Sequence, residues 1–184
     1  MKKIILGSLL LVQFVTSAQD KMLTKTGMIA FESLDNVFKD VKALNKGVTC
    51  VLNTKTGEIA SLALAKEFRF KIALMEEHFN ESYVESDKFP KAVFRGNLEN
   101  FDFKTLSSTE KEYNLKGKLE LHGRTQDIVT TAKVFKNGSS VEIHTEFKVP
   151  STDYGILIPT MAKNKVTNNI NIICDFVVKP VAGK

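Results

Sequence analysis

From Val141 to Val149, one set of alternate residues is largely apolar and the other set is charged or polar. A β-strand places successive side chains on opposite faces, so this period predicts a strand with one buried and one solvated face. A second strand-like run, Asp127 to Phe135, precedes it, and Asn137-Gly138 between them is a dipeptide typical of a two-residue hairpin. A hairpin with one apolar face needs further strands to bury that face.

The same period predicts strands along most of the chain. Each predicted segment combines alternating apolar residues with glycine, proline or asparagine near its ends. Together with the two hairpin arms they give roughly eight strands, with a compact turn at Thr54–Gly57 between two of them. The further segments are residues 27–33, 47–53, 58–70, 91–98, 112–122 and 166–178.

One segment, Lys71 to Asn80, changes from strand to helix periodicity. Ile72, Met75 and Phe79 recur at helical spacing between polar residues, which predicts an amphipathic helix of about two to three turns. Residues 34–45 also have helical spacing, and we expect a short helix or a turn-rich connection there. The predicted fold class is mainly β, with one amphipathic helix and a second short helix as an open alternative.

About eight antiparallel strands with one apolar face need a closed core, as a sandwich or an up-and-down barrel, and a barrel removes exposed edges. An eight-stranded barrel is either filled by its own side chains or able to hold one elongated ligand, and periodicity does not separate these cases. The large side chains expected inside are Phe31, Leu62, Leu64, Phe94, Leu119, Leu121, Val134, Ile143 and Phe147. Small residues that would leave room there are Ala60, Ala92, Gly96, Gly117 and Ala132.

The N-terminus has the organisation of a secretory signal peptide. Lys2 and Lys3 precede an apolar stretch from Ile4 to Val15, and Thr16-Ser17-Ala18 supplies small residues before a cleavage point. The stretch is too short to span a bilayer. We therefore expect a signal peptide over residues 1–18, cleavage after Ala18, a periplasmic or secreted location, and one barrel domain over residues 19–184.

Cys50 and Cys174 lie far apart in the sequence, each on the apolar face of a predicted strand. Export makes a disulfide between them chemically permitted. Buried cysteine also commonly behaves as a small apolar residue. The sequence favours two free thiols and leaves the disulfide as the alternative.

Several functional classes have no signature in this chain. Loss of Lys2 and Lys3 with the leader reduces the net charge from +5 to +3, which does not suggest a nucleic-acid partner. There is no serine elbow and no glycine-rich nucleotide loop, and thiolates are disfavoured on apolar faces, so we expect no catalytic residue and no enzyme activity. No cysteine pair or histidine cluster has the spacing of metal ligands, and we expect neither a metal nor another cofactor.

Two motifs resemble those of the YceI-like family. The run Met75-Glu-Glu-His-Phe79, followed by residues 86–96 with the sequence Ser-Asp-Lys-Phe-Pro-Lys-Ala-Val-Phe-Arg-Gly, resembles the family's central motif. Residues 117–125, a strand entering a His-Gly-Arg-Thr turn, resemble its second motif. The leader and the strand–helix–strand order agree as well, so the resemblance covers the mature chain. It implies an extended antiparallel eight-stranded lipocalin-like barrel, exported and without catalytic activity.

Members of this family bind amphiphiles with long apolar tails in the barrel interior. The resemblance therefore implies binding of a polyisoprenoid, a related isoprenoid or a fatty acyl lipid, for transport, storage or sequestration, by a protein that does not span the membrane. The alternative is an exported stress-response or interaction module with a filled barrel and no lipid. A homodimer is compatible with both. The residues predicted to contact the ligand are Phe31, Leu62, Leu64, Phe68, Met75, Phe79, Phe89, Phe94, Leu119, Leu121, Val134 and Phe147.

These residues also have simple structural roles. Met75 and Phe79 would pack on the core, as the apolar face of an amphipathic helix normally does. The strand residues would form core in a filled barrel. His78 and His122 could contact a head group or titrate, but each is a lone histidine, for which a structural hydrogen bond is the favoured role.

Overall fold

The computed structural model describes residues 20–33, 42–157 and 168–181. These residues form nine strands, helix α1 (Ala73–His78) with a following π-helical turn η2 (Phe79–Tyr83), and short 3₁₀ turns. The strands are β1 (Lys21–Ser33), β2 (Lys42–Asn53), β3 (Glu58–Leu64), β4 (Arg69–Phe70), β5 (Lys91–Leu98), β6 (Lys111–Leu121), β7 (Arg124–Asn137), β8 (Ser140–Pro150) and β9 (Asn169–Pro180). The 3₁₀ turns are η1 (Ala65–Glu67), η3 (Phe103–Thr105) and η4 (Ser151–Tyr154).

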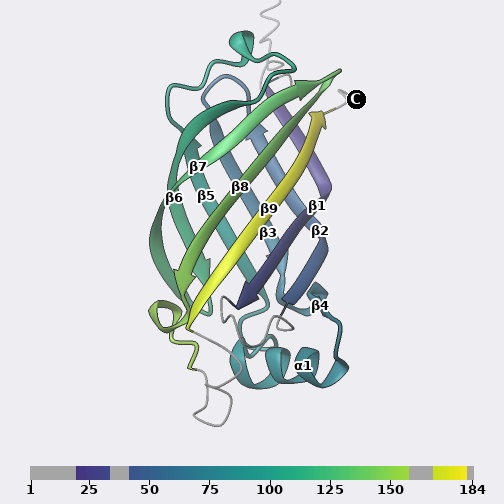
Figure 1. Ribbon diagram of the computed structural model, residues 1–184, viewed down its shortest axis with the longest axis vertical. Coiled ribbons are helices and arrows are strands. Elements are labelled where there is room, and N and C mark those ends of the chain that lie inside the picture. Colours follow the sequence, from purple (N-terminus) through teal and green to yellow (C-terminus); the bar gives the residue numbers. More distant parts are fainter. Residues whose placement is uncertain (1–19, 34–41, 158–167, 182–184) are drawn as a thin grey trace, which may run out of the picture.

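The strands form a closed antiparallel barrel (Figure 1). Consecutive strands pair from β5 to β9, and β5 also pairs with β3. The sheet closes because β1 pairs with both β9 and β2. The two-residue strand β4 lies outside this cycle and pairs with the beginning of β2. The expected eight-stranded barrel with one amphipathic helix is confirmed.

The predicted hairpin between β7 and β8 is present, but its turn lies one residue further along the chain. Asn137 pairs with Ser140, so the two turn residues are Gly138 and Ser139 rather than Asn137 and Gly138. Gly138 has φ of 60°, which fits the first central position of a type II′ turn, where glycine is favoured.

Other predicted boundaries also differ. Residues 42–45, expected in a helix or turn-rich connection, belong to β2, while residues 34–41 of that segment lie outside the described residues. The expected strand 58–70 ends at Leu64, because η1 redirects the chain before β4. The predicted leader, residues 1–18, also lies outside the described residues.

The predicted amphipathic helix is present as α1 and η2, shifted slightly toward the C-terminus. It covers one end of the barrel (Figure 1). Arg69 Nη1 lies 3.0 Å from Glu76 Oε1, which ties α1 to β4. Among the helices of the described residues, none is long and apolar enough to cross a membrane.

Strand β3 presents the opposite face to the interior from the one expected. Directly opposed residues of antiparallel strands share a face, and Ser61 opposes the interior residue Phe94. Leu62 and Leu64, predicted inside, are 36% and 42% exposed on the outer face, and Ala60 alternates with them. The interior residues of β3 are Ile59, Ser61 and Ala63. The prediction was wrong because both alternating sets of this strand contain apolar residues, so the period does not show which face points into the barrel.

The barrel interior is packed at the end near the β7–β8 hairpin, away from α1 (Figure 1). Aliphatic side chains from most strands meet there and exclude water. The most deeply buried are Val48, Leu52, Leu98, Val134, Val141, Ile143 and Val178. This end therefore supplies apolar packing that stabilises the fold. The opposite end can then be packed less densely.

Candidate functional site

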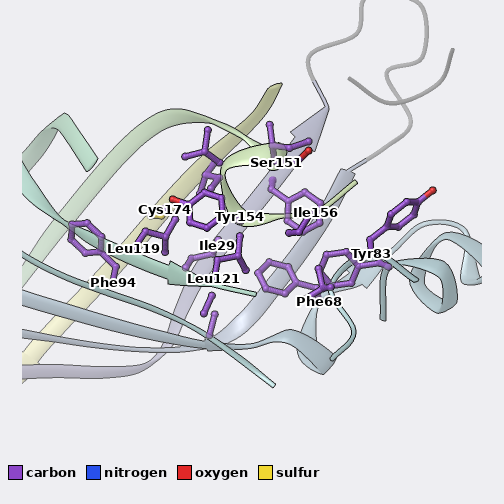
Figure 2. Close-up of a pocket in the computed structure, with 18 of the residues that line it drawn as sticks. Ile29, Phe68, Tyr83, Phe94, Leu119, Leu121, Ser151, Tyr154, Ile156 and Cys174 are labelled. Atoms are coloured by element: carbon purple, nitrogen blue, oxygen red, sulfur yellow. The ribbon is translucent and has the colours of Figure 1, made fainter. Parts of the chain in front are cut away.

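A cavity of about 620 Å³ lies inside the barrel at the end that α1 covers (Figure 2). Ligand sites typically have volumes of about 300–1,000 Å³. Interior-facing strand residues form its wall, and α1, η2 and η4 complete it. The lining is mostly aliphatic and aromatic, and no described lining residue is Asp, Glu, Lys or Arg. The arrangement suits a long apolar molecule that water solvates poorly.

Phe94 lies between the cavity and the packed core. Its side chain packs against both buried clusters of the barrel. A Cβ placed on Gly96 or Gly117 would lie 2.7 or 2.6 Å from Cζ of this ring, so the ring covers both glycines. These glycines were expected to leave room for a ligand, but they leave room for Phe94 instead. The ring therefore fills the space over both glycines and forms part of the cavity wall.

Four phenylalanines form a cluster at the other end. Phe31 of β1 has ring centroids 5.3 Å from both Phe68 and Phe79, and Phe70 lies 5.2 Å from Phe79. Such tilted and edge-to-face pairs add stability beyond their burial. Because all four rings line the cavity, they join β1, the β3–β4 segment and η2 into one apolar wall.

The cavity reaches the surface beside α1. Ile72 and Leu74 are lining residues, yet they are 43% and 57% exposed. His78 also belongs to the lining and is exposed. An apolar molecule could therefore enter here without a change in the strands. A polar group of that molecule would remain in contact with water at this exposed end.

His122 joins two segments at this end of the barrel. Its Nδ1 lies 2.9 Å from the carbonyl oxygen of Tyr154, to which it donates, and its Nε2 lies 3.0 Å from Glu85 Oε2. The ring also stacks edge-on against Phe89, with centroids 4.3 Å apart. His122 and Gly123 form the β6–β7 turn with φ of 51° and 71°. The favoured structural role of His122 agrees with these contacts, which fix η4 against the loop before β5.

The hydroxyl groups of the cavity lining differ in whether they have a hydrogen-bond partner. Thr145 donates to the carbonyl oxygen of Thr131 at 2.8 Å, and Thr130 donates to that of Glu146 at 3.0 Å. The Tyr154 hydroxyl and Ser151 Oγ have no hydrogen-bond partner among the described residues. Burial also raises the pKa of Tyr154 to about 12, helped by neighbouring Asp153, so the phenol stays protonated.

Cys50 and Cys174 are both buried free thiols, as the sequence favoured. Burial raises the pKa of Cys174 to about 12, and the adjacent Asp175 contributes in the same direction. Burial also raises the pKa of Cys50. Neutral thiols of this kind are poor nucleophiles. In the described part of the chain, no group of three or more His, Cys, Asp or Glu side chains is placed to hold a metal ion.

Most of the residues predicted to contact a ligand lie in the cavity wall, although position alone does not test the contact. Those in the wall are Phe31, Phe68, Met75, Phe79, Phe94, Leu119, Leu121 and Phe147. Val134 faces inward but is fully buried in the packed end, and Leu62 and Leu64 lie on the outer face. Phe89 is absent from the lining and packs on the His122-Gly123 turn.

Several lining residues are not among those predicted to contact a ligand. Ile170, Ile172 and Cys174 alternate along β9 toward the cavity, and the period of that strand could have identified them. Tyr154 and Ile156 lie in or after η4, where no strand or helix period exists to predict their direction.

A family model described as YceI-like domain matches residues 20–178. Among solved structures, the fold is similar to a polyisoprenoid binding domain from Saccharophagus degradans implicated in plant cell wall breakdown. The TM-score is 0.76 at 13% identity, covering 89% of this chain and 99% of that chain.

Two further structures show the same fold. BcnA of Burkholderia cenocepacia has a TM-score of 0.68 at 12% identity and covers 83% of this chain and 95% of its own. The YCEI protein of Campylobacter jejuni has a TM-score of 0.55 at 12% identity, covering 96% and 98%. No protein of curated function matches this sequence.

Proposed function

The chain belongs to the YceI-like domain family, and from this membership and its hollow barrel we propose that it binds a long-chain amphiphilic lipid without catalysing a reaction. The ligand we propose is a polyisoprenoid or a related isoprenoid or fatty acyl lipid, held by its apolar part. The observation that carries the proposal is the apolar cavity, which Phe94 lines and which reaches the surface beside α1.

The energetics of the cavity support this class of ligand. Each methylene transferred from water to an apolar site contributes about 0.8 kcal/mol, so about ten methylenes contribute about 8 kcal/mol. Loss of translational, rotational and chain freedom offsets part of this gain. The free energy that remains favours binding of an apolar tail, because water solvates such a tail poorly.

The choice of a polyisoprenoid among apolar tails rests on a neighbouring structure. The Saccharophagus degradans domain is described as polyisoprenoid binding and shares the barrel. The cavity described here supports an apolar tail of either the isoprenoid or the fatty acyl kind. The proposed role is transport, storage or sequestration of the lipid.

The proposed location is the periplasm or the extracellular space. Its basis is the signal-peptide pattern of residues 1–18, with Ala18 before the cleavage point. A barrel that encloses an apolar tail provides a way to carry it through water. The alternative of a surface interaction module assumed a filled barrel, whereas this interior is hollow beside α1.

Filling the cavity tests the proposal. Ala92 is a lining residue opposed to Ala63, and Ala92→Phe places a ring in the space assigned to the lipid. Val129→Phe is the matched control, because Val129 is 71% exposed. Both proteins are equilibrated with geranylgeraniol, and bound lipid is measured by native mass spectrometry. We expect Ala92→Phe to lose most of the bound lipid and Val129→Phe to retain it.

Overpacking costs about 1–3 kcal/mol, so thermal melting establishes that each variant is folded. Ala63→Leu is the second, smaller filling variant if Ala92→Phe does not fold. Retention of the lipid by a folded filling variant would show that the lipid is held outside the cavity and would overturn the proposal.

A further inference from the structure

Both ring nitrogens of His122 face hydrogen-bond acceptors. Nδ1 lies 2.9 Å from the carbonyl oxygen of Tyr154, and Nε2 lies 3.0 Å from Glu85 Oε2. A carbonyl oxygen and an ionised carboxylate only accept hydrogen bonds, whereas a neutral imidazole carries a proton on one nitrogen alone. The neutral ring therefore makes one of these two hydrogen bonds and places a lone pair against the other oxygen. Only the imidazolium, with a proton on each nitrogen, makes both.

The two acceptors belong to different segments of the cavity wall. Glu85 directly follows Tyr83 and Val84, which are lining residues after α1. Tyr154 is itself a lining residue and belongs to η4, and Figure 2 shows both tyrosines at the cavity. His122 therefore joins two parts of the wall, and a change in its protonation changes how firmly they are joined.

The backbone at this contact adopts an unfavourable conformation on both sides. Glu85 and His122 have φ of 47° and 51°, and positive φ is uncommon for residues other than glycine. Such conformations persist only where surrounding contacts hold them. Lys88 N and Phe89 N donate to the carbonyl oxygen of Glu85 at 2.8 and 2.9 Å, and the Phe89 ring lies 4.3 Å from that of His122. Fixed backbone thus brings the carboxylate and the imidazole together, and the proton count of the ring determines whether they attract.

The neighbouring charges leave the imidazole as the group that changes in the neutral range. Besides Glu85, the charged residues of the segments around the ring are Asp87, Lys88, Glu120, Arg124 and Asp153. In the described part of the chain none of these five forms a hydrogen bond or an ion pair with the ring, and Lys88 Nζ lies 3.9 Å from the other oxygen of Glu85. Histidine ordinarily changes charge between about pH 5 and 8, whereas carboxylates do so at lower pH and Lys and Arg at higher pH.

We propose that His122 is a positioning residue whose second proton controls the wall of the cavity. The imidazolium holds η4 and the segment after η2 together through two hydrogen bonds, and the neutral ring holds only one of them. The contact is complete below the histidine range and loses one hydrogen bond as the pH rises through that range. The consequence for a ligand rests on the proposed function: bound lipid leaves the protein faster at alkaline pH than at acid pH.

Two substitutions at this contact have opposite expected effects. Glu85→Gln replaces the carboxylate by an amide that donates to Nε2 of the neutral ring and accepts from the imidazolium, so the two segments stay joined at both pH values. His122→Asn keeps a residue type that tolerates positive φ, but its shorter side chain does not reach both partners. His144→Gln is the matched control, because His144 Nδ1 lies 2.6 Å from Asp175 Oδ1 and His144 does not line the cavity.

The experiment measures release of geranylgeraniol from the loaded exported chain to phosphatidylcholine vesicles at about pH 5.5 and about pH 8.5. Both lipids keep their charge over this range, so the pH acts on the protein. Protein-bound lipid is followed over time by native mass spectrometry. We expect the unmodified protein and His144→Gln to release lipid about three- to tenfold faster at the higher pH, which is the effect of one hydrogen bond. Glu85→Gln should release it slowly at both pH values, and His122→Asn should release it quickly at both.

The outcomes separate this inference from the proposed function. A pH response of Glu85→Gln equal to that of the unmodified protein overturns the role of the proton, and so does loss of the response in His144→Gln. Thermal melting tests the contact without lipid: the unmodified protein should lose stability relative to Glu85→Gln as the pH rises from about 5.5 to about 8.5, and parallel curves overturn the inference. Failure of every protein to bind geranylgeraniol overturns the proposed function, and the melting comparison then decides the role of His122.

Discussion

The ring of Phe94 lies across Gly117, so that a Cβ added to Gly117 would be 2.6 Å from Cζ of the ring. Phe94 lies on β5 and Gly117 on the adjacent strand β6. The ring fills the space over this glycine and is also part of the cavity wall. The contact therefore limits which substitutions the fold tolerates at Gly117.

Gly117→Ala should destabilise the protein by about 1–3 kcal/mol, the usual cost of overpacking. The added Cβ would lie 2.5 Å from the carbonyl oxygen of Arg95 as well as against the Phe94 ring, and backbone does not move aside easily. Urea denaturation measures the change. Gly47→Ala is the control, because its close contact is the flexible carboxylate end of Glu67, and it should change stability little. Equal effects of the two substitutions would contradict the packing described here.

Phe94→Asp should unfold the protein or abolish lipid retention, because it places a carboxylate against the apolar interior. Arg95→Asp on the exposed outer face of the same strand should change stability by no more than about 0.5 kcal/mol. Circular dichroism melting and lipid extraction measure the two effects. A folded, lipid-retaining Phe94→Asp protein would show that the interior face of β5 is misassigned.

Leu119→Ala should cost about 2–5 kcal/mol, since Leu119 is 7% exposed and packs in the cluster that bounds the cavity. Leu64→Ala should cost far less, because Leu64 is 42% exposed on the outer face of β3. The free energy of unfolding from urea titration distinguishes them. A large loss at Leu64 with none at Leu119 would reverse the assignment of faces.

Alkaline pH should destabilise the folded protein through Cys174. Burial raises the pKa of this thiol from 9.0 to about 12, so the folded state keeps the proton between these values while the unfolded state releases it. The contribution to stability is complete below about pH 9 and is lost as the pH rises through about 12.

Cys174→Ala tests this linkage. The variant should show a shallower fall in the free energy of unfolding above about pH 9, by up to about 1.4 kcal/mol per pH unit for one proton. Measurements at neutral pH correct for the packing lost with the sulfur atom. Parallel pH profiles for the two proteins would contradict the linkage.

The sequence predicted best where the two faces of a strand differ in chemistry. β8 alternates apolar with charged residues, so its interior face followed from the period, whereas its hairpin with β7 was predicted from Asn137-Gly138, one residue away from the observed turn. β3 has apolar residues on both faces, and its pairing with β5 decided what the period could not. The two motifs that resemble the YceI-like family indicated the barrel, and the fold agrees with them.

The cavity depends on relationships that a linear pattern does not contain. Gly96 and Gly117 look like empty interior positions until Phe94 is seen to cover them. Tyr154 belongs to a short turn without periodicity, and its direction follows from the contact between His122 and its carbonyl oxygen. The amphipathic helix predicted over Lys71 to Asn80 is present as α1 and η2, and its Met75 lines the cavity.

The most direct test of lipid binding is native mass spectrometry of the mature chain, residues 19–184, purified from the exported fraction of its own host. The spectrum is compared before and after organic extraction. We predict a stoichiometric apolar adduct that extraction removes and identifies. A bare protein mass, together with failure to bind added isoprenoids and fatty acyl lipids, would contradict the account.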